Sequence, residues 1–207
     1  MQYTERSQVV FSPDGKTLAS GGQCLGISLW DVASGKQLAT LEGDNGYGPK
    51  AMAFSPDGKT LASAGYAGPL GLWEVATGKN TATFEIDEDC LPAAFTSDGK
   101  TLATSASDKG KGWVKLWDVA TGKEQATLKG HTGEVSSMTF SPDGKTLALG
   151  GEDGTIKLWD VAKDEELATL KGHTGGVWSL AFSADGKMLA SGSEDRTIKL
   201  WEVAKAK

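Results

Sequence analysis

The chain has 207 residues, and its 21 Lys and Arg against 27 Asp and Glu give a formal net charge of −6 at pH 7. This acidic balance is unsuited to general binding of a phosphate backbone, so we expect no nucleic-acid partner. The sequence shows no apolar core of a signal peptide and no run long enough to span a membrane, so we expect a soluble, cytoplasmic protein without a membrane partner. Its two cysteines, Cys24 and Cys90, lack metal-binding or redox spacing and are expected to be free thiols.

A five-fold repeat runs through the chain. Ser-Pro-Asp-Gly or a close variant follows a phenylalanine at five positions, Phe11, Phe54, Phe95, Phe140 and Phe182. The numbers of successive phenylalanines differ by 43, 41, 45 and 42, a period typical of propeller blades. Each copy is followed by a Leu-Trp pair, whose tryptophans are Trp30, Trp73, Trp117, Trp159 and Trp201.

Each repeat unit is predicted to be a four-stranded antiparallel meander, with strands a, b, c and d. In the fourth unit an Asp-Gly turn joins the apolar residues 135–140 to residues 146–149, which is a strong hairpin signal. A second turn precedes residues 155–159, where Ile156 and Leu158 alternate with other residues at period two. A third turn then leads into a last short strand that starts near Glu166.

The units follow one another without a linker, so we expect one domain over residues 1–207. Its blades are predicted at about 1–42, 43–84, 85–129, 130–171 and 172–207. The third unit carries an insertion at residues 109–113, which we expect to form a longer b–c loop. The sequence stops about where strand d of the fifth unit should begin. We therefore expect five copies each of strands a, b and c but four of strand d.

The repeat resembles that of the WD-repeat β-propeller family. The resemblance lies in the Gly-His pairs at 130–131 and 172–173, the Ser-Pro-Asp-Gly turns, and the Trp-Asp endings at 30–31, 117–118 and 159–160. It implies an all-β propeller of five four-stranded antiparallel blades, the last blade lacking its outer strand. Family members commonly have seven blades and close by mixing strands from both termini, and this sequence departs on both counts. Three alternatives remain: a five-bladed ring closed by side-chain packing, an oligomer, or a piece of a longer array.

The resemblance also implies a buried hydrogen-bonded set of His, Ser or Thr, Asp and Trp in each blade. The fifth unit has all four members at the expected spacing: His173, Ser191, Asp195 and Trp201. The fourth unit has His131, Asp153 and Trp159, but Leu149 stands at the hydroxyl position. A grouping of Ser, His and Asp could suggest a nucleophilic triad, but the resemblance favours a structural role, and we expect no catalytic residue and no enzyme.

Two further motifs imitate ligand sites. Gly-Lys-Thr occurs at 15–17, 58–60, 99–101 and 144–146 without the earlier glycine of a phosphate-binding loop, so we expect hairpin turns there. The acidic run at Asp87 and Asp89 lacks the spaced ligands of a calcium loop. We therefore expect neither a metal nor a cofactor.

The function is expected to reside on the rim that carries the b–c and d–a loops, because these loops differ most between units. The resemblance places Trp178 and its repeat equivalents Lys50, Leu91 and Ser136 at the channel mouth, where partners bind. The same rim carries Tyr47, Tyr66, Trp113, Asp87 and Asp89. Acidic groups beside aromatic rings favour a basic peptide or a cation, so we expect a non-catalytic scaffold that binds a protein or peptide.

Three alternatives to this function stay open. Trp178 could pack only against a neighbouring loop. The chain could be a structural repeat unit that assembles as a homo-oligomer through the open fifth blade, since an unpaired strand is a template for pairing. It could also be a carbohydrate-binding propeller, with Tyr47, Tyr66, Trp113 and Trp178 as stacking platforms.

Overall fold

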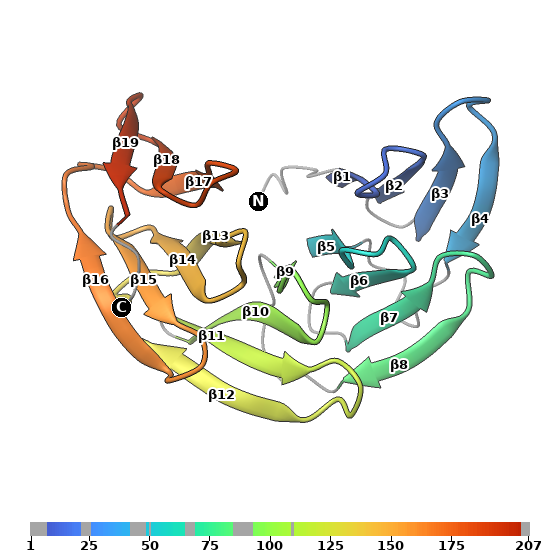
Figure 1. Ribbon diagram of the computed structural model, residues 1–207, viewed down its shortest axis with the longest axis horizontal. Coiled ribbons are helices and arrows are strands. Elements are labelled where there is room, and N and C mark those ends of the chain that lie inside the picture. Colours follow the sequence, from blue (N-terminus) through green and yellow to red (C-terminus); the bar gives the residue numbers. More distant parts are fainter. Residues whose placement is uncertain are drawn as a thin grey trace. The chain divides into compact units, whose positions relative to one another are not determined.

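The computed structural model describes residues 8–21, 26–41, 49, 51–64, 69–84, 93–108 and 110–203. Every regular element in these ranges is a β-strand, and Figure 1 labels them. The chain divides into two compact units, Met1–Phe95 and Thr96–Lys207. The single domain expected over residues 1–207 stays a prediction.

The first unit contains two four-stranded antiparallel sheets. The first sheet has the order β1 (Gln8–Phe11), β2 (Thr17–Gly21), β3 (Ile27–Asp31) and β4 (Gln37–Leu41). The second sheet has the order β5 (Ala51–Phe54), β6 (Thr60–Ala64), β7 (Leu70–Glu74) and β8 (Asn80–Phe84). Each is the up-and-down meander that the turn spacing predicts.

The second unit holds most of the third sheet and all of the fourth and fifth. The third sheet has the order β12 (Glu124–Lys129), β11 (Lys111–Asp118), β10 (Thr101–Asp108) and β9 (Ala93–Phe95), of which β9 belongs to the first unit. The fourth has β13 (Val135–Phe140), β14 (Thr146–Gly151), β15 (Ile156–Asp160) and β16 (Glu165–Leu170). The fifth has only β17 (Val177–Phe182), β18 (Met188–Ser193) and β19 (Ile198–Glu202) among the described residues. Five blade-like sheets, the last with three strands in the described part of the chain, confirm the predicted fold class.

The a–b turns owe their uniform shape to one side-chain arrangement. In the fourth sheet the Ser141 hydroxyl donates to Asp143 Oδ1 at 2.6 Å, and the same oxygen accepts the Lys145 amide at 3.1 Å. Gly144 has a φ of 70°, a conformation that glycine adopts without strain. The Ser141 hydroxyl, followed by the Lys145 amide, holds the pKa of Asp143 below its usual range. The other four sheets repeat the bond from hydroxyl to carboxylate.

The insertion in the third sheet lengthens its hairpin instead of forming the longer loop that we expected. Strands β10 and β11 have eight residues each, and the added ladder pairs are Ala106 with Trp113, Ser107 with Gly112 and Asp108 with Lys111. A Cβ built on Gly112 would lie 2.7 Å from the Gly133 carbonyl oxygen, so only glycine fits this close approach. The extended hairpin thereby packs against the loop that precedes β13.

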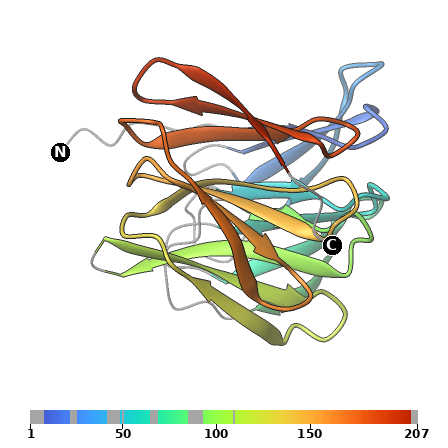
Figure 2. The same cartoon turned by 60° about the vertical axis from the view of Figure 1, so that its left-hand side comes forward.

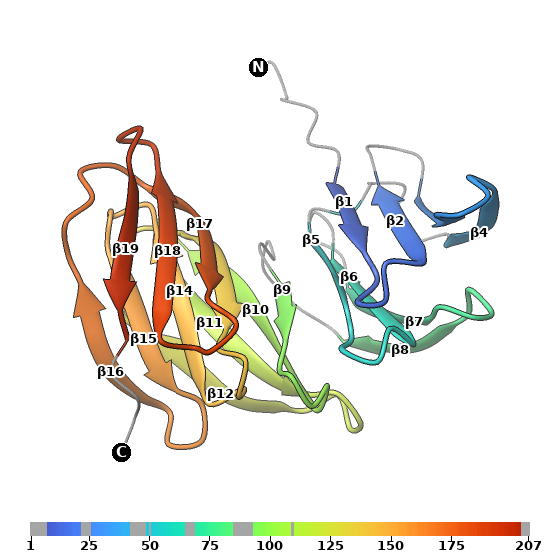
Figure 3. The same ribbon diagram turned by 45° about the horizontal axis from the view of Figure 1, so that its top comes forward.

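Adjacent sheets bury a core between them, because a lone sheet cannot bury both of its faces. Between the first two sheets, Ile27 and Leu29 of β3 pack in a cluster that includes Leu61 and Trp73. Between the fourth and fifth, Ile156 and Leu158 of β15 pack with Leu189 in the same way. Figures 2 and 3 show the sheets of the second unit stacked on one another.

The repeat tryptophans are fixed by a hydrogen bond within their own sheets. The indole Nε1 donates over 2.8 Å to a hydroxyl on strand b in four sheets, in the pairs Trp30–Ser20, Trp73–Ser63, Trp117–Thr104 and Trp201–Ser191. In the fourth sheet Leu149 takes the hydroxyl position, and Trp159 Nε1 has no partner among the described residues. The loss of a hydroxyl therefore leaves a buried donor unsatisfied.

We predict that Thr104→Val, which removes the hydroxyl at nearly constant shape, lowers the free energy of unfolding by about 1–3 kcal/mol. The buried Trp117 indole would lose its acceptor. The loss in free energy of unfolding caused by Trp117→Phe should then be about 1 kcal/mol smaller in the Thr104→Val background than in the wild type. Urea denaturation of the two single variants and the double variant measures this coupling.

Trp159→Phe is the matched control, because it removes comparable ring area without removing a hydrogen bond. Trp159→Phe should lower the free energy of unfolding by no more than Trp117→Phe does. Additive effects of Thr104→Val and Trp117→Phe would contradict a stabilising bond between the two side chains.

Candidate functional site

The fifth sheet brings together all four members of the set that the sequence singled out. His173 comes from the loop before β17, Ser191 from β18, Asp195 from the β18–β19 loop and Trp201 from β19. His173 Nδ1 lies 2.8 Å from Asp195 Oδ2, and its Nε2 lies 2.7 Å from Ser191 Oγ. The Asp195 carboxylate can only accept, so Nδ1 is the donor in that contact, and Ser191 Oγ also accepts the Trp201 N–H at 2.8 Å.

Asp195 ties two rim loops together. It accepts the Thr197 hydroxyl at 2.6 Å and the backbone amides of Thr197 and Thr174 at 2.9 and 3.0 Å. The Thr197 hydroxyl lowers the pKa of Asp195 most, and the Thr174 amide and His173 lower it further against the opposing effect of burial. The carboxylate is therefore a fixed acceptor for both loops.

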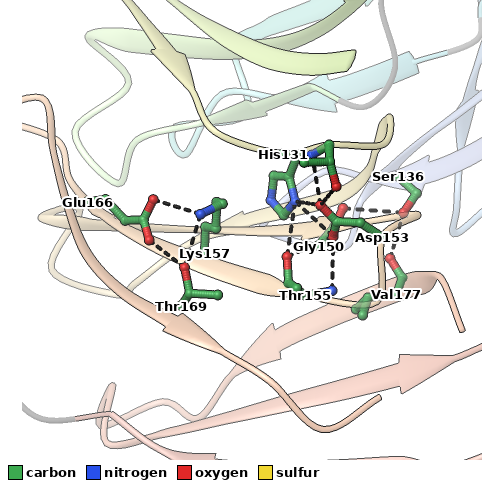
Figure 4. A network of polar contacts seen from close by, with 10 residues as sticks. His131, Ser136, Gly150, Asp153, Thr155, Lys157, Glu166, Thr169 and Val177 are labelled. Atoms are coloured by element: carbon green, nitrogen blue, oxygen red, sulfur yellow. Dashed lines mark hydrogen bonds and ion pairs between the residues drawn. The ribbon is translucent and has the colours of Figure 1, made fainter. Parts of the chain in front are cut away.

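The fourth sheet repeats this arrangement with one member missing (Figure 4). Asp153 accepts the Thr155 hydroxyl at 2.7 Å and the Thr132 amide at 2.9 Å, and its Oδ2 lies 3.1 Å from His131 Nδ1. Burial acts to raise the pKa of Asp153, but these hydrogen bonds and His131 outweigh it and leave the pKa well below its usual range. His131 Nε2 has no partner within the described ranges, because Leu149 replaces the serine.

This geometry favours a structural role for the Ser, His and Asp grouping. Ser191 is only 2% exposed, and its oxygen is shared between Trp201 and His173. A nucleophile must reach a substrate, whereas this hydroxyl is enclosed by its own hydrogen-bond partners. The arrangement fixes the loops of the rim.

Three of the predicted partner-binding residues lie in the described part of the chain: Trp178, Ser136 and Trp113. The other six lie outside the described residues: Lys50, Leu91, Tyr47, Tyr66, Asp87 and Asp89. Trp113 is a half-buried residue of the extended strand β11.

Ser136 and Trp178 occupy equivalent β-bulges. The ladder register shifts between Val135 and Ser137 in β13 and between Val177 and Ser179 in β17, so the intervening residue has no opposite partner. Bulges re-aim side chains and are frequent at functional sites. Ser136 is used internally, since its hydroxyl donates to the Val177 carbonyl at 2.7 Å (Figure 4). Trp178 instead presents 44% of its surface to solvent.

Gly176 lies against Trp178 and was not identified from the sequence. A Cβ built on Gly176 would lie 3.5 Å from the Trp178 ring and 3.4 Å from Glu152 Cα, and the Gly176 carbonyl accepts the Glu194 amide at 2.9 Å. The backbones of the exposed Glu152 and Glu194 thus both lie against Gly176. The sequence does contain a signal for this residue, because Gly176 of the fifth unit stands where the fourth unit has Glu134.

Two findings concern other kinds of site. Among the residues that the structure describes, no group of three or more His, Cys, Asp and Glu side chains is placed to hold a metal ion. The same residues form no helix that is long and apolar enough to cross a membrane.

We predict that stability falls as the pH drops below about 4, because the unfolded chain takes up protons near the ordinary Asp pKa whereas folded Asp153 stays ionised to lower pH. Asp153→Asn should lower the free energy of unfolding at neutral pH by about 1–3 kcal/mol. It should also flatten the decline in stability between about pH 4 and pH 2.

Melting temperatures of both proteins across this range test the prediction. Glu152→Gln changes the charge by the same amount at the neighbouring position and should preserve the acid decline of the wild type. An Asp153→Asn curve parallel to that of the wild type would contradict the assignment.

Comparison with known proteins agrees with this architecture. The chain matches the family described as WD domain, G-beta repeat over residues 7–31, 35–68, 122–160 and 164–202, which is more than half of its length. A stretch of 57 residues, 28% of the chain, is 37% identical to eukaryotic translation initiation factor 3 subunit I of Anopheles gambiae. This match spans 17% of that relative's own length. WD-repeat proteins generally act as scaffolds for protein interactions. The repeats, the sheets and the family match together show that this chain belongs to the WD-repeat family.

Proposed function

We propose that this chain is a non-catalytic scaffold that binds a basic peptide segment of a partner protein on the rim formed by the b–c and d–a loops. The observation that carries the proposal is Trp178, a large aromatic side chain held at a β-bulge with 44% of its surface exposed. Tryptophan is enriched among the residues that dominate binding energy at protein interfaces.

The chemistry around Trp178 favours a cationic ligand. Glu152 and Glu194 approach Gly176 from two b–c loops, and the Trp178 ring lies against the same glycine. The face of an indole ring attracts a Lys or Arg side chain, and adjacent carboxylates add charge-assisted hydrogen bonds. The net charge of −6 would further speed the approach of a basic partner.

The comparisons support a protein partner in general terms. By its name, the Anopheles protein is a subunit of a larger translation factor. For the present chain we propose, by extension, that it binds a protein partner in the cytoplasm.

A second function, an assembling repeat unit, is favoured by a separate observation. Ile198 and Leu200 of β19 are 80% and 70% exposed. This apolar surface lies on the fifth sheet, which has three strands among the described residues, and it does not involve Trp178.

We predict that random peptides selected for binding to the wild-type protein are enriched in Lys and Arg. Trp178→Ala should weaken the selected peptides by at least about tenfold, because it removes the aromatic anchor. Replacing both Glu152 and Glu194 by Gln should weaken binding and reduce its dependence on salt. Fluorescence anisotropy with labelled selected peptides provides the dissociation constants.

Leu167→Ala is the matched control, because Leu167 is another exposed large apolar residue and lies on the outer strand β16. It should leave peptide binding unchanged, and all variants should keep the melting temperature of the wild type. Selected peptides without basic residues would contradict the proposed site, and so would a Trp178→Ala variant that binds the peptides as tightly as the wild type.

A further inference from the structure

The fourth and fifth sheets hold their rim loops in different ways. In the fifth sheet, the Ser193 hydroxyl donates to the Gly175 carbonyl at 2.9 Å and accepts the Asp195 amide at 3.1 Å. Ser193 thereby joins the loop before β17 to the loop between β18 and β19, and we call this contact the serine clamp. The same ladder position of the fourth sheet is Gly151, which has no side chain to form a clamp.

The position of the neighbouring imidazole requires glycine at residue 151. A Cβ built on Gly151 would lie 2.4 Å from His131 Nδ1 and 2.7 Å from Asp153 Oδ1. Figure 4 shows His131 beside Asp153. In the fifth sheet a serine with its own Cβ, Ser193, stands at this position beside His173. The two imidazoles therefore lie differently relative to strand b of their sheets.

Leu149 explains why the imidazole of the fourth sheet lies against Gly151. In the fifth sheet, His173 Nε2 lies 2.7 Å from the Ser191 hydroxyl. The fourth sheet has Leu149 in place of this serine, and the leucine is 1% exposed. A leucine side chain is larger than serine and offers the imidazole no hydrogen bond, so it favours the place next to Gly151. The departures at 149 and 151 are therefore coupled, and together they remove the serine clamp.

The extended hairpin of the third sheet supplies another hold on this rim loop. The Gly133 carbonyl, which is the repeat equivalent of the Gly175 carbonyl, accepts the Gly112 amide at 3.0 Å. The Ser107 hydroxyl donates to Glu134 Oε1 at 3.1 Å. Ser107 and Gly112 stand opposite one another in the part of the hairpin that the insertion adds. The carbonyl that lacks a serine partner is thus held from the neighbouring sheet.

We infer that this part of the hairpin is a strap that holds the rim loop at 130–134 in place of the serine clamp. The strap consists of Ser107 and Gly112, and both of its contacts lie within the unit Thr96–Lys207. Its hold extends to the next loop, because the Glu134 carbonyl accepts the Glu152 amide at 2.9 Å. The inference stands apart from the proposed peptide site, since its test involves no ligand.

Amide hydrogen exchange of the full chain, followed by mass spectrometry, tests the strap. Gly112→Ala places a Cβ 2.7 Å from the Gly133 carbonyl oxygen and should push the hairpin away. We expect amides at 130–134 to exchange at least about tenfold faster in this variant, because the loop opens locally more often. Ser107→Ala should speed exchange in the same segment by less. Unchanged exchange at 130–134 in both variants overturns the inference.

Transplanting the serine clamp gives the decisive result. Leu149→Ser together with Gly151→Ser provides the fourth sheet with the two serines of the fifth, so the Gly133 carbonyl gains a hydroxyl donor from its own sheet. In this background Gly112→Ala should speed exchange at 130–134 by less than about threefold. An undiminished effect of Gly112→Ala overturns the inference.

Melting temperatures test the coupling between residues 149 and 151. Gly151→Ser alone should lower the melting temperature, because its Cβ meets the imidazole, and it should lower it less when combined with Leu149→Ser. Gly150→Ser is the matched control. A Cβ on Gly150 would meet Ser137 Oγ at 2.6 Å and Val177 Cγ1 at 2.8 Å, so its effect should be the same in both backgrounds. Equal effects of Gly151→Ser in both backgrounds contradict the coupling.

The fifth sheet provides the converse experiment. Ser193→Gly removes the serine clamp there, so amides at 172–176 should exchange faster than in the wild type. The same segment should be unaffected by Gly112→Ala. Unchanged exchange at 172–176 in Ser193→Gly would contradict the role of the clamp. Circular dichroism establishes that each variant is folded, and Ser107→Ala carries the test of the strap if Gly112→Ala unfolds the protein.

Discussion

The packing of one sheet against the next is the constraint on which the rest of the structure depends. A sheet of three or four short strands buries one face on its neighbour and leaves the other face for the next sheet. Leu29 and Leu158, on strand c of their sheets, are covered in this way. Stability is therefore a property of neighbouring pairs of sheets, such as the first with the second and the fourth with the fifth.

Hydrogen bonds then fix how each packed sheet presents its loops. In the fifth sheet, Trp201, Ser191, His173 and Asp195 form a continuous chain of polar contacts from strand c to the rim. The fourth sheet keeps its carboxylate contacts without the hydroxyl, because Leu149 contributes to the apolar cluster instead. Apolar packing thus replaces a polar contact at this position, and among the described residues it leaves the Trp159 Nε1 donor and the ring nitrogen Nε2 of His131 buried without a partner.

Much of this architecture could be predicted because the repeat specifies it locally. The Asp-Gly turns, the alternation around Ile156 and the spacing between Ser191 and Trp201 each depend on one unit alone, so five copies reinforce the same prediction. The extended hairpin at Gly112 could not be predicted in this way, because glycine and lysine give no strand signal. What holds Gly112 in a strand is its close approach to Gly133, a contact between sheets that local patterns do not contain.

The proposed peptide site was only partly visible for the same reason. Trp178 was identified because it departs from the repeat, but the bulge that aims it and the glycine beneath it are features of the folded sheet. Ser136 occupies the same bulge and turns inward to the Val177 carbonyl, so position alone does not decide exposure. At the bulge of the fifth unit an indole replaces the serine, and it lies against Gly176, where the fourth unit has Glu134. Two departures from the repeat, at 176 and 178, therefore meet at the position where a large aromatic side chain is exposed.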